Sequence, residues 1–194
     1  MNRRIVGARN FEDILAIVEA EHGEFDAVNA ATACSRLAKA ARSSVNSAEI
    51  DNPRVQALFR TIARLGPRMK PQEVANIIWG LATLEWQPGE GHMRGALEGA
   101  AVRVAPSMNV QNVANTIWGL ATLGWQAGEG PMRGALEAAA VRVAPSMNAQ
   151  DVANTIWGLA TLGWQPAEGP MRGALEAAAV RVAPSMKADR KSVV

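Results

Sequence analysis

The segment VANTIWGLATLGW begins at Val113 and occurs again, unchanged, at Val152, and the closely similar VANIIWGLATLEW begins at Val74. Each copy therefore starts 39 residues after the one before it. Residues 110–148 and 149–187 differ at five of 39 positions, and residues 71–109 and 110–148 differ at seven. All six tryptophans fall in these three copies, two in each. This period predicts an array in which one structural unit is stacked on the next.

Each repeat is expected to form two helices. In the second copy, Asn109 is a suitable N-cap for a helix that runs to about Leu123, and Gly124 is suited to end it. Val113, Ile117, Leu120 and Ala121 form one apolar stripe on this helix. The opposite face, here called the polar ridge, carries Gln111, Asn115, Trp118 and Thr122.

The second helix is expected between Pro131 and Pro145, because proline suits the first turn of a helix and disfavours helical geometry in the residue before it. No segment alternates with period two, so no sheet is expected. Two short helices cannot bury their apolar faces alone, whereas stacked pairs can. The sequence therefore predicts an all-α fold, a right-handed α-solenoid of about four helix-pair repeats with a 39-residue period.

The chain divides into four parts. Residues 1–9 are a basic lead that is expected to be disordered. Residues 10–70 are expected to hold a capping helix over Phe11–Glu21 and a degenerate first repeat, in which Val28–Ala40 matches the Val74 segment only loosely. Residues 71–186 are the three near-identical repeats, and residues 187–194 are a charged tail.

Composition excludes several classes of function. There is one cysteine, Cys34, and there are two histidines, His22 and His92, with no partners at metal-ligand spacing. No run of apolar residues is long enough for a membrane span, and no nucleophile is paired with a base. We therefore expect a soluble chain that is not an enzyme and that uses no metal, no cofactor, no small-molecule substrate and no membrane.

The string VANTIWGLATLGW, in helix pairs with a period just under forty, resembles the octotricopeptide repeats of algae and other protists. Residues 25–41, FDAVNAATACSRLAKAA, are similar to the first repeat of many such proteins. The resemblance covers roughly residues 10–186 and implies a role in RNA processing, stability or translation in a chloroplast or mitochondrion. The chain departs from some relatives in lacking a C-terminal RAP domain. Its first residues also do not form a clear transit peptide, because acids follow at once.

The polar ridge supplies the first candidate RNA-binding residues. An aromatic ring flanked by amide and hydroxyl groups suits single-stranded RNA, since bases stack on rings and polar groups meet base edges. The candidates are Asn76, Trp79, Thr83, Asn115, Trp118, Thr122, Asn154, Trp157 and Thr161. The alternative is that each tryptophan packs between neighbouring helices. A code that distinguishes repeats would have to use positions that vary, such as Glu73/Asn112/Asp151 and Ile77/Thr116/Thr155.

Arginines supply the second set of candidates. Arg103, Arg142 and Arg181 recur in the second helices without an acid three or four residues away, so they are available to phosphates or simply to water. Arg60, Arg64 and Arg68 are spaced by four and form either a phosphate contact or a solvated face. The overall charge gives weaker support, because residues 71–186 hold six arginines against nine acids.

The leading hypothesis is a non-catalytic α-solenoid that binds single-stranded RNA. The rival is a protein–protein interaction scaffold of the same architecture, which the acidic balance of residues 71–186 favours. A third possibility is a fragment of a duplicated array without an independent role.

Overall fold

The computed structural model describes residues 1–41, 51–87, 91–125, 130–164 and 169–185, and these ranges contain helices and no strands. The α-helices, in chain order, are α1 Asn2–Gly7, α2 Phe11–Glu21, α3 Ala27–Ala41, α4 Pro53–Leu65, α5 Pro71–Thr83, α6 His92–Val104, α7 Val110–Thr122, α8 Pro131–Val143, α9 Ala149–Thr161 and α10 Pro170–Val182. Short 3-10 turns follow several of them, including η3 Gly66–Arg68, η4 Ala105–Ser107 and η5 Ala144–Ser146.

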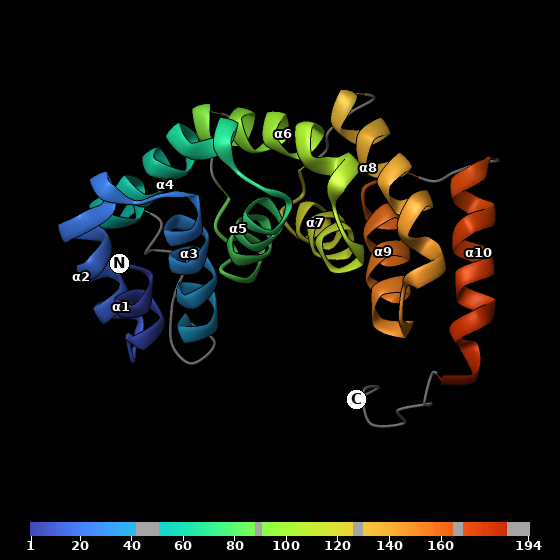
Figure 1. Cartoon of the computed structure of the whole chain (residues 1–194), viewed down its shortest axis with the longest axis horizontal. Helices are drawn as coiled ribbons and strands as arrows, with labels where there is room; N and C mark the ends of the chain where they lie inside the picture. The colour runs from blue at the N-terminus through green and yellow to red at the C-terminus, as the bar shows by residue number, and fades with distance from the viewer. Residues whose placement is uncertain (42–50, 88–90, 126–129, 165–168, 186–194) are drawn as a thin grey trace.

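The helices form two layers of an arch (Figure 1). Helices α3, α5, α7 and α9 pack side by side in chain order and line the inner side of the arch. Helices α2, α4, α6, α8 and α10 pack on one another in the same order and form the outer layer. Each inner helix also packs on the outer helix that follows it in the chain. This arrangement confirms the predicted all-α solenoid of stacked helix pairs.

Helix boundaries follow the local signals in the sequence. The Asn109 side chain accepts a hydrogen bond of 2.9 Å from the Asn112 backbone N–H and so caps α7. Helix α8 begins at Pro131, as predicted, and ends at Val143, where the 3-10 turn η5 that contains Pro145 takes over. Helix α2 spans the predicted range Phe11–Glu21.

Helices α5, α7 and α9 end in the same hydrogen-bonded motif. After α7, the Trp125 N–H donates to the Leu120 carbonyl at 3.0 Å and the Gly124 N–H donates to the Ala121 carbonyl at 3.1 Å. This is a Schellman cap, in which the residue after the helix adopts left-handed geometry and the next residue packs back on the helix. Gly124 has φ +63°, as the cap requires. The cap fixes Trp125 against the core, where it is almost completely buried.

A glycine in each of α5, α7 and α9 sets the distance to the preceding inner helix. A Cβ on Gly119 would lie 2.7 Å from Ile78 Cγ2 and 3.1 Å from the Ile78 carbonyl oxygen. A Cβ on Gly158 would meet Ile117 in the same way, at 2.7 and 3.0 Å. Only a residue without a side chain allows the two backbones to approach this closely, so the WG dipeptide of the repeat is a packing requirement.

The same contact gives the register of the first inner helix. A Cβ on Gly80 would meet Cys34 Sγ at 2.8 Å and the Cys34 carbonyl oxygen at 3.1 Å. Cys34 therefore occupies in α3 the place that Ile78 occupies in α5 and Ile117 in α7. The sequence match of Val28–Ala40 to the Val74 segment was out of register by two residues, because Cys34 corresponds to Ile78 and not to Gly80.

The N-terminal end is more ordered than the sequence suggested. Residues 1–9 were expected to be disordered, but α1 lies within them and its Ile5 is completely buried in the core. Arg4 of α1 pairs with Glu21 of α2. The prediction of disorder was wrong because one isoleucine among three arginines gives no visible apolar stripe. The charged tail 187–194 lies outside the described residues.

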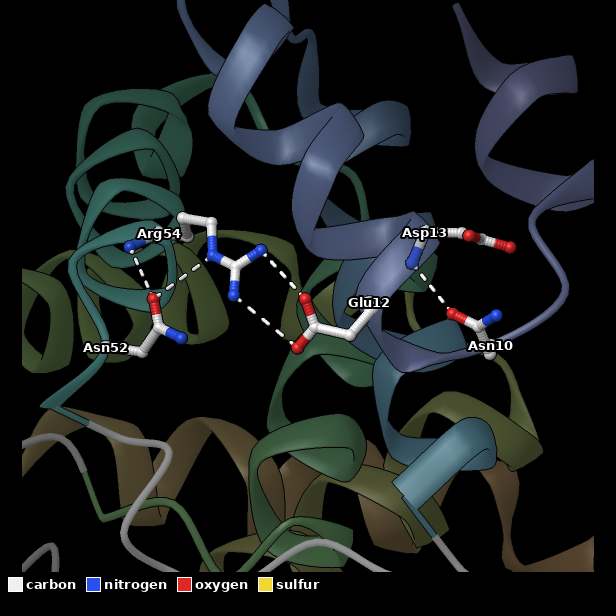
Figure 2. Close-up of polar contacts among 5 residues, drawn as sticks. All are labelled: Asn10, Glu12, Asp13, Asn52 and Arg54. Carbon is white, nitrogen blue, oxygen red and sulfur yellow. Dashed lines mark hydrogen bonds and ion pairs between the residues drawn. The ribbon is translucent and has the colours of Figure 1, made fainter.

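Polar contacts join the outer helices at this end (Figure 2). The Asn10 side chain accepts from the Asp13 N–H and caps α2. Arg54 of α4 pairs with Glu12 of α2, with 3.0 Å between Arg54 Nη1 and Glu12 Oε2. The Asn52 side chain caps α4 and also accepts from the Arg54 side chain. These contacts hold the first two outer helices in place, and all of them are made by residues outside the three near-identical repeats.

We predict that Gly119→Ala destabilises the chain although alanine is the better helix former. The added methyl group would overlap Ile78 Cγ2 and crowd the Ile78 carbonyl oxygen, at a cost of about 1–3 kcal/mol. Circular dichroism during urea unfolding measures the effect. Gly134→Ala in α8 is the matched control, because nothing lies within 4 Å of a Cβ there, and it should be neutral or stabilising. Equal midpoints for the two variants would contradict the packing role.

We also predict that Glu85→Gly stabilises the chain. Glu85 occupies the left-handed position of the cap after α5, with φ +54°, where the other two copies have Gly124 and Gly163. Removing the side chain relieves about 1 kcal/mol of strain, partly offset by the greater freedom of glycine in the unfolded chain. The urea midpoint should rise for Glu85→Gly and fall for the converse change Gly124→Ala.

Candidate nucleic-acid interface

The polar ridge lies on the inner side of the arch. In α7 the apolar stripe faces the core, with Val113, Ile117 and Leu120 completely buried. Neighbouring inner helices cover its flanks, and the outer layer covers its back. The ridge residues Asn115 and Trp118 are half-buried, and Gln111 and Thr122 are exposed. The inner helices therefore line the surface that remains open, and the ridge is its centre.

The ridge tryptophans differ in how far they are covered. Trp79 and Trp118 are partly buried and pack against the core, whereas Trp157 is 48% exposed. Trp79 and Trp118 lie on helices that have inner helices on both sides, and among the described elements α9 has one on one side only. The packing interpretation of these residues is thus correct in part, since the neighbouring helices cover a portion of each ring and leave the rest accessible.

Amides and hydroxyls flank each ring, but they are not equally available. The Asn76, Asn115 and Asn154 side chains are half-buried, and no hydrogen bond to another described residue holds them. The Thr83 hydroxyl donates to the Trp79 carbonyl at 2.8 Å, and the Thr122 hydroxyl donates to the Trp118 carbonyl at 2.9 Å. These two threonines can still accept a hydrogen bond, but their donors are used within the helix. The asparagines are therefore the stronger candidates for contact with base edges.

The first inner helix carries a different surface. The register set by Cys34 places Val28, Thr32, Ser35 and Lys39 of α3 where the repeats have the ridge residues. Val28 and Lys39 are exposed, and Thr32 and Ser35 are half-buried. The inner face thus changes from an aromatic and amide surface on α5, α7 and α9 to one without an aromatic residue on α3.

The two varying positions named in the sequence analysis are buried in the core or used to cap helices. Thr116 and Thr155 are completely buried, as is Ile77 in the same place on α5. Glu73 and Asn112 are also buried. The Glu73 carboxylate accepts from the Lys70 N–H at 2.6 Å, so Glu73 acts in capping α5. Asp151 forms the equivalent capping box of α9 with Asn148. The expectation that a repeat code would use these positions is wrong, because they face the core or cap the helix.

Arginines follow one edge of the inner layer. Arg142 Nη2 donates to the Ala105 carbonyl at 3.2 Å and to the Met108 carbonyl at 2.6 Å, at the turn that leads into α7. Arg103 makes the same bonds to Gly66 and Met69 before α5, and Arg181 makes them to Ala144 and Met147 before α9. The set Arg64, Arg103, Arg142 and Arg181 is here called the arginine ladder.

Arg64 is the first member of the ladder. Its Nη2 lies 3.4 Å from the Gly23 and Phe25 carbonyl oxygens, just before α3. Each ladder arginine thus links its own repeat to the turn of the repeat before it. Only Nη2 of each ladder arginine makes these bonds. Nε and Nη1 make no hydrogen bond to a described residue, and all four side chains stay exposed. The repeat pattern in the sequence identifies these positions but not their structural role, because the acceptors are distant backbone carbonyls.

The other arginines are distributed differently. Arg60 is exposed on α4, but Arg68 lies beyond the end of α4 in η3, so the expected single helical face includes only Arg60 and Arg64. On the outer layer, Arg133 pairs with Glu137 at 2.7 Å, and Arg94 and Arg172 form the same pair with Glu98 and Glu176. Arg94, Arg133 and Arg172 are therefore neutralised locally, whereas the ladder arginines are not paired with a described acid.

The second tryptophan of each repeat belongs to the core. Trp86, Trp125 and Trp164 are all almost completely buried. The Trp86 ring meets the rings of Phe11 and Phe59 edge-on, with centroids 6.1 and 5.8 Å apart. The Arg94 guanidinium lies 5.5 Å from the Trp125 ring centroid. Trp86 and Trp125 therefore pack against side chains of the preceding outer helices.

The other features of the described residues give no sign of a second site. Burial raises the pKa of the Cys34 thiol to about 12, so it stays protonated and unreactive at neutral pH. Within the described ranges, histidine, cysteine and acidic side chains form no group of three that could hold a metal ion. None of the described helices combines the length and apolar character that a bilayer span needs.

A groove of about 290 Å³ lies between α9 and α10 and includes Ile156, Leu159 and Trp164. Their equivalents in α7 and in the turn after it are buried by the next repeat.

One family model matches almost the whole chain. Residues 11–190 match the model described as the N-terminal domain of the Tbc2 translation factor. The chain belongs to this family. The match begins at the first residue of α2, so it includes the inner helices, the outer helices and the arginine ladder and leaves α1 out. A search of curated proteins found no match to the chain.

We predict that Arg142→Gln lowers the free energy of unfolding by about 1–2 kcal/mol, because two charge-assisted hydrogen bonds between repeats are lost. Arg133→Gln is the matched control on the outer layer, where loss of the pair with Glu137 should cost about 0.3–0.5 kcal/mol. Urea unfolding of both variants measures the difference. If Arg142→Gln were no more destabilising than Arg133→Gln, the ladder would not hold the repeats together.

Proposed function

We propose that this chain is a non-catalytic module that binds single-stranded RNA along the inner side of its arch and acts in organellar translation. The observation that carries the proposal is the polar ridge, which presents a partly exposed tryptophan beside an asparagine that bonds to no described residue on three successive inner helices. Helical-repeat proteins that read RNA use two or three such side chains for each base. Membership of a family named for a translation factor supports the proposal.

The two candidate sets have complementary roles in this mechanism. Bases stack on the accessible parts of Trp79, Trp118 and Trp157, and each stacked base contributes about 1–3 kcal/mol. The adjacent asparagine amides donate to and accept from base edges. The arginine ladder meets the phosphates at the edge where the inner helices begin, using the donors that its backbone contacts leave open. The ladder thus serves both the packing and the ligand.

The alternative function is a protein–protein interaction scaffold. The excess of acids in residues 71–186, nine against six arginines, favours it. The local distribution of charge favours RNA, because Glu98, Glu137 and Glu176 lie on the outer layer and are paired there. The two functions differ in their response to salt, since RNA binding releases counterions and a mainly apolar protein interface does not.

The test is fluorescence anisotropy with a randomised single-stranded RNA pool at about 50 and 200 mM salt. We expect binding that weakens steeply with salt. Trp118→Leu, which keeps an apolar side chain for packing, should weaken it by about 1–3 kcal/mol. Asn115→Ala should also weaken it, and Arg142→Gln should reduce the salt dependence by about one counterion.

Arg133→Gln is the matched control, because it removes one positive charge from the outer layer and should leave RNA affinity nearly unchanged. Circular dichroism confirms that every variant is folded at the assay temperature. Absence of binding at the lower salt by the folded chain would contradict the proposed function. Binding that all four substitutions affect equally would contradict the location of the site.

A further inference from the structure

The polar ridge carries the same residues on three consecutive inner helices. The ridge positions are identical in α5, α7 and α9 and are Gln72/Gln111/Gln150, Asn76/Asn115/Asn154, Trp79/Trp118/Trp157 and Thr83/Thr122/Thr161. Between residue 71 and residue 87, the three copies differ at only four positions. Whether the three surfaces can recognise different bases therefore depends on where those four positions lie.

None of the four differences falls on the ridge. Two are the buried or capping positions described above, Glu73/Asn112/Asp151 and Ile77/Thr116/Thr155. The other two lie at the helix ends: Pro71/Val110/Ala149 occupy the first helical position, and Glu85/Gly124/Gly163 occupy the left-handed position of the C-terminal cap. Each ridge thus offers a base the same ring and the same amides.

The three surfaces are also placed by the same contacts. In both the α5–α7 and the α7–α9 interface, a Cβ on the glycine would lie 2.7 Å from Cγ2 of the preceding isoleucine. The ladder bonds repeat with little change, at 2.7, 2.6 and 2.5 Å to the methionine carbonyls. Because the same surface recurs at a constant spacing, a ligand that contacts all three ridges in the same way must also repeat at that spacing.

We propose that the inner face selects RNA tracts of one repeated base, with at least three consecutive identical bases seated on α5, α7 and α9. This inference rests on the proposed function. One base per repeat is the arrangement that helical-repeat readers of RNA use. The α3 surface, with Val28, Thr32, Ser35 and Lys39 in place of the ridge, ends the uniform stretch. A longer tract also binds in several equivalent registers, so its affinity rises with the number of registers.

The first measurement identifies the base. Anisotropy titrations compare four nine-nucleotide RNAs, each made of one base, with a mixed sequence of equal length. We expect one of the four to bind at least about 10-fold more tightly than the mixed sequence, which corresponds to 1.4 kcal/mol. Four equal affinities that also match the mixed sequence would overturn the proposal.

The decisive measurement removes the effect of composition. Two nine-nucleotide RNAs contain six copies of the preferred base and three copies of another. In one RNA the three foreign bases follow the six preferred ones, and in the other they occupy every third position, so no run of three remains. The unbroken tract should bind several-fold more tightly, and Asn115→Ala should reduce that preference while Arg133→Gln leaves it unchanged.

The outcomes separate this proposal from the one on which it rests. Equal, salt-sensitive affinity for the two RNAs of matched composition would overturn the selection of uniform tracts and leave RNA binding intact. No salt-sensitive binding to any of the RNAs would overturn the proposed function itself. Tighter binding to the unbroken tract that Asn115→Ala does not affect would show that the ridge is not what reads the bases, and it would also overturn the proposal.

Discussion

The contact between a glycine of one inner helix and the backbone of the helix before it is the constraint on which this solenoid depends. Gly119 on Ile78 and Gly158 on Ile117 bring successive backbones closer than any side chain would allow. That distance places Arg142 and Arg181 within hydrogen-bonding reach of the turn before the preceding inner helix. It also decides how much of each ridge tryptophan its neighbours cover. Helix spacing, repeat linkage and surface exposure thus follow from one missing side chain.

The near-identity of the repeats has a structural explanation that is separate from recognition. Each unit must end its inner helix in a Schellman cap, offer free carbonyls in a 3-10 turn and supply an arginine to the turn before it. These tasks use the sequences LATLGW and VRVAPSM, so most positions are constrained by backbone hydrogen bonds. The ridge residues Asn115 and Gln111 make no such bond to a described residue, and packing alone does not explain why they are unchanged.

The helix bounds were predictable because they depend on neighbouring residues in the sequence. The roles of the site residues were less predictable because they depend on contacts between residues far apart in the sequence. Proline, glycine and asparagine act on the residues beside them, so the bounds of α7, α8 and α2 follow from the sequence. The acceptors of Arg142 lie 34 and 37 residues away on backbone atoms, which no side-chain pattern reveals. The burial of Thr116 could not be predicted either, because a threonine on a helix is expected to be exposed unless the positions of the neighbouring helices are known. The order of α1 depends on a single buried residue, Ile5.

The distribution of charge resolves an apparent conflict between the acidic repeats and an RNA ligand. A phosphate responds to charges within about one Debye length, roughly 8–10 Å at moderate salt, so the sum over a whole repeat is the wrong quantity. Glu98, Glu137 and Glu176 are held on the outer layer by arginines of their own helices. Glu73 and Asp151 cap the starts of inner helices, where the helix dipole already offsets a negative charge. The ladder arginines keep their full charge because their partners are neutral carbonyl oxygens. An array with a net negative charge can therefore still present a regular line of cations along the edge where its inner helices begin.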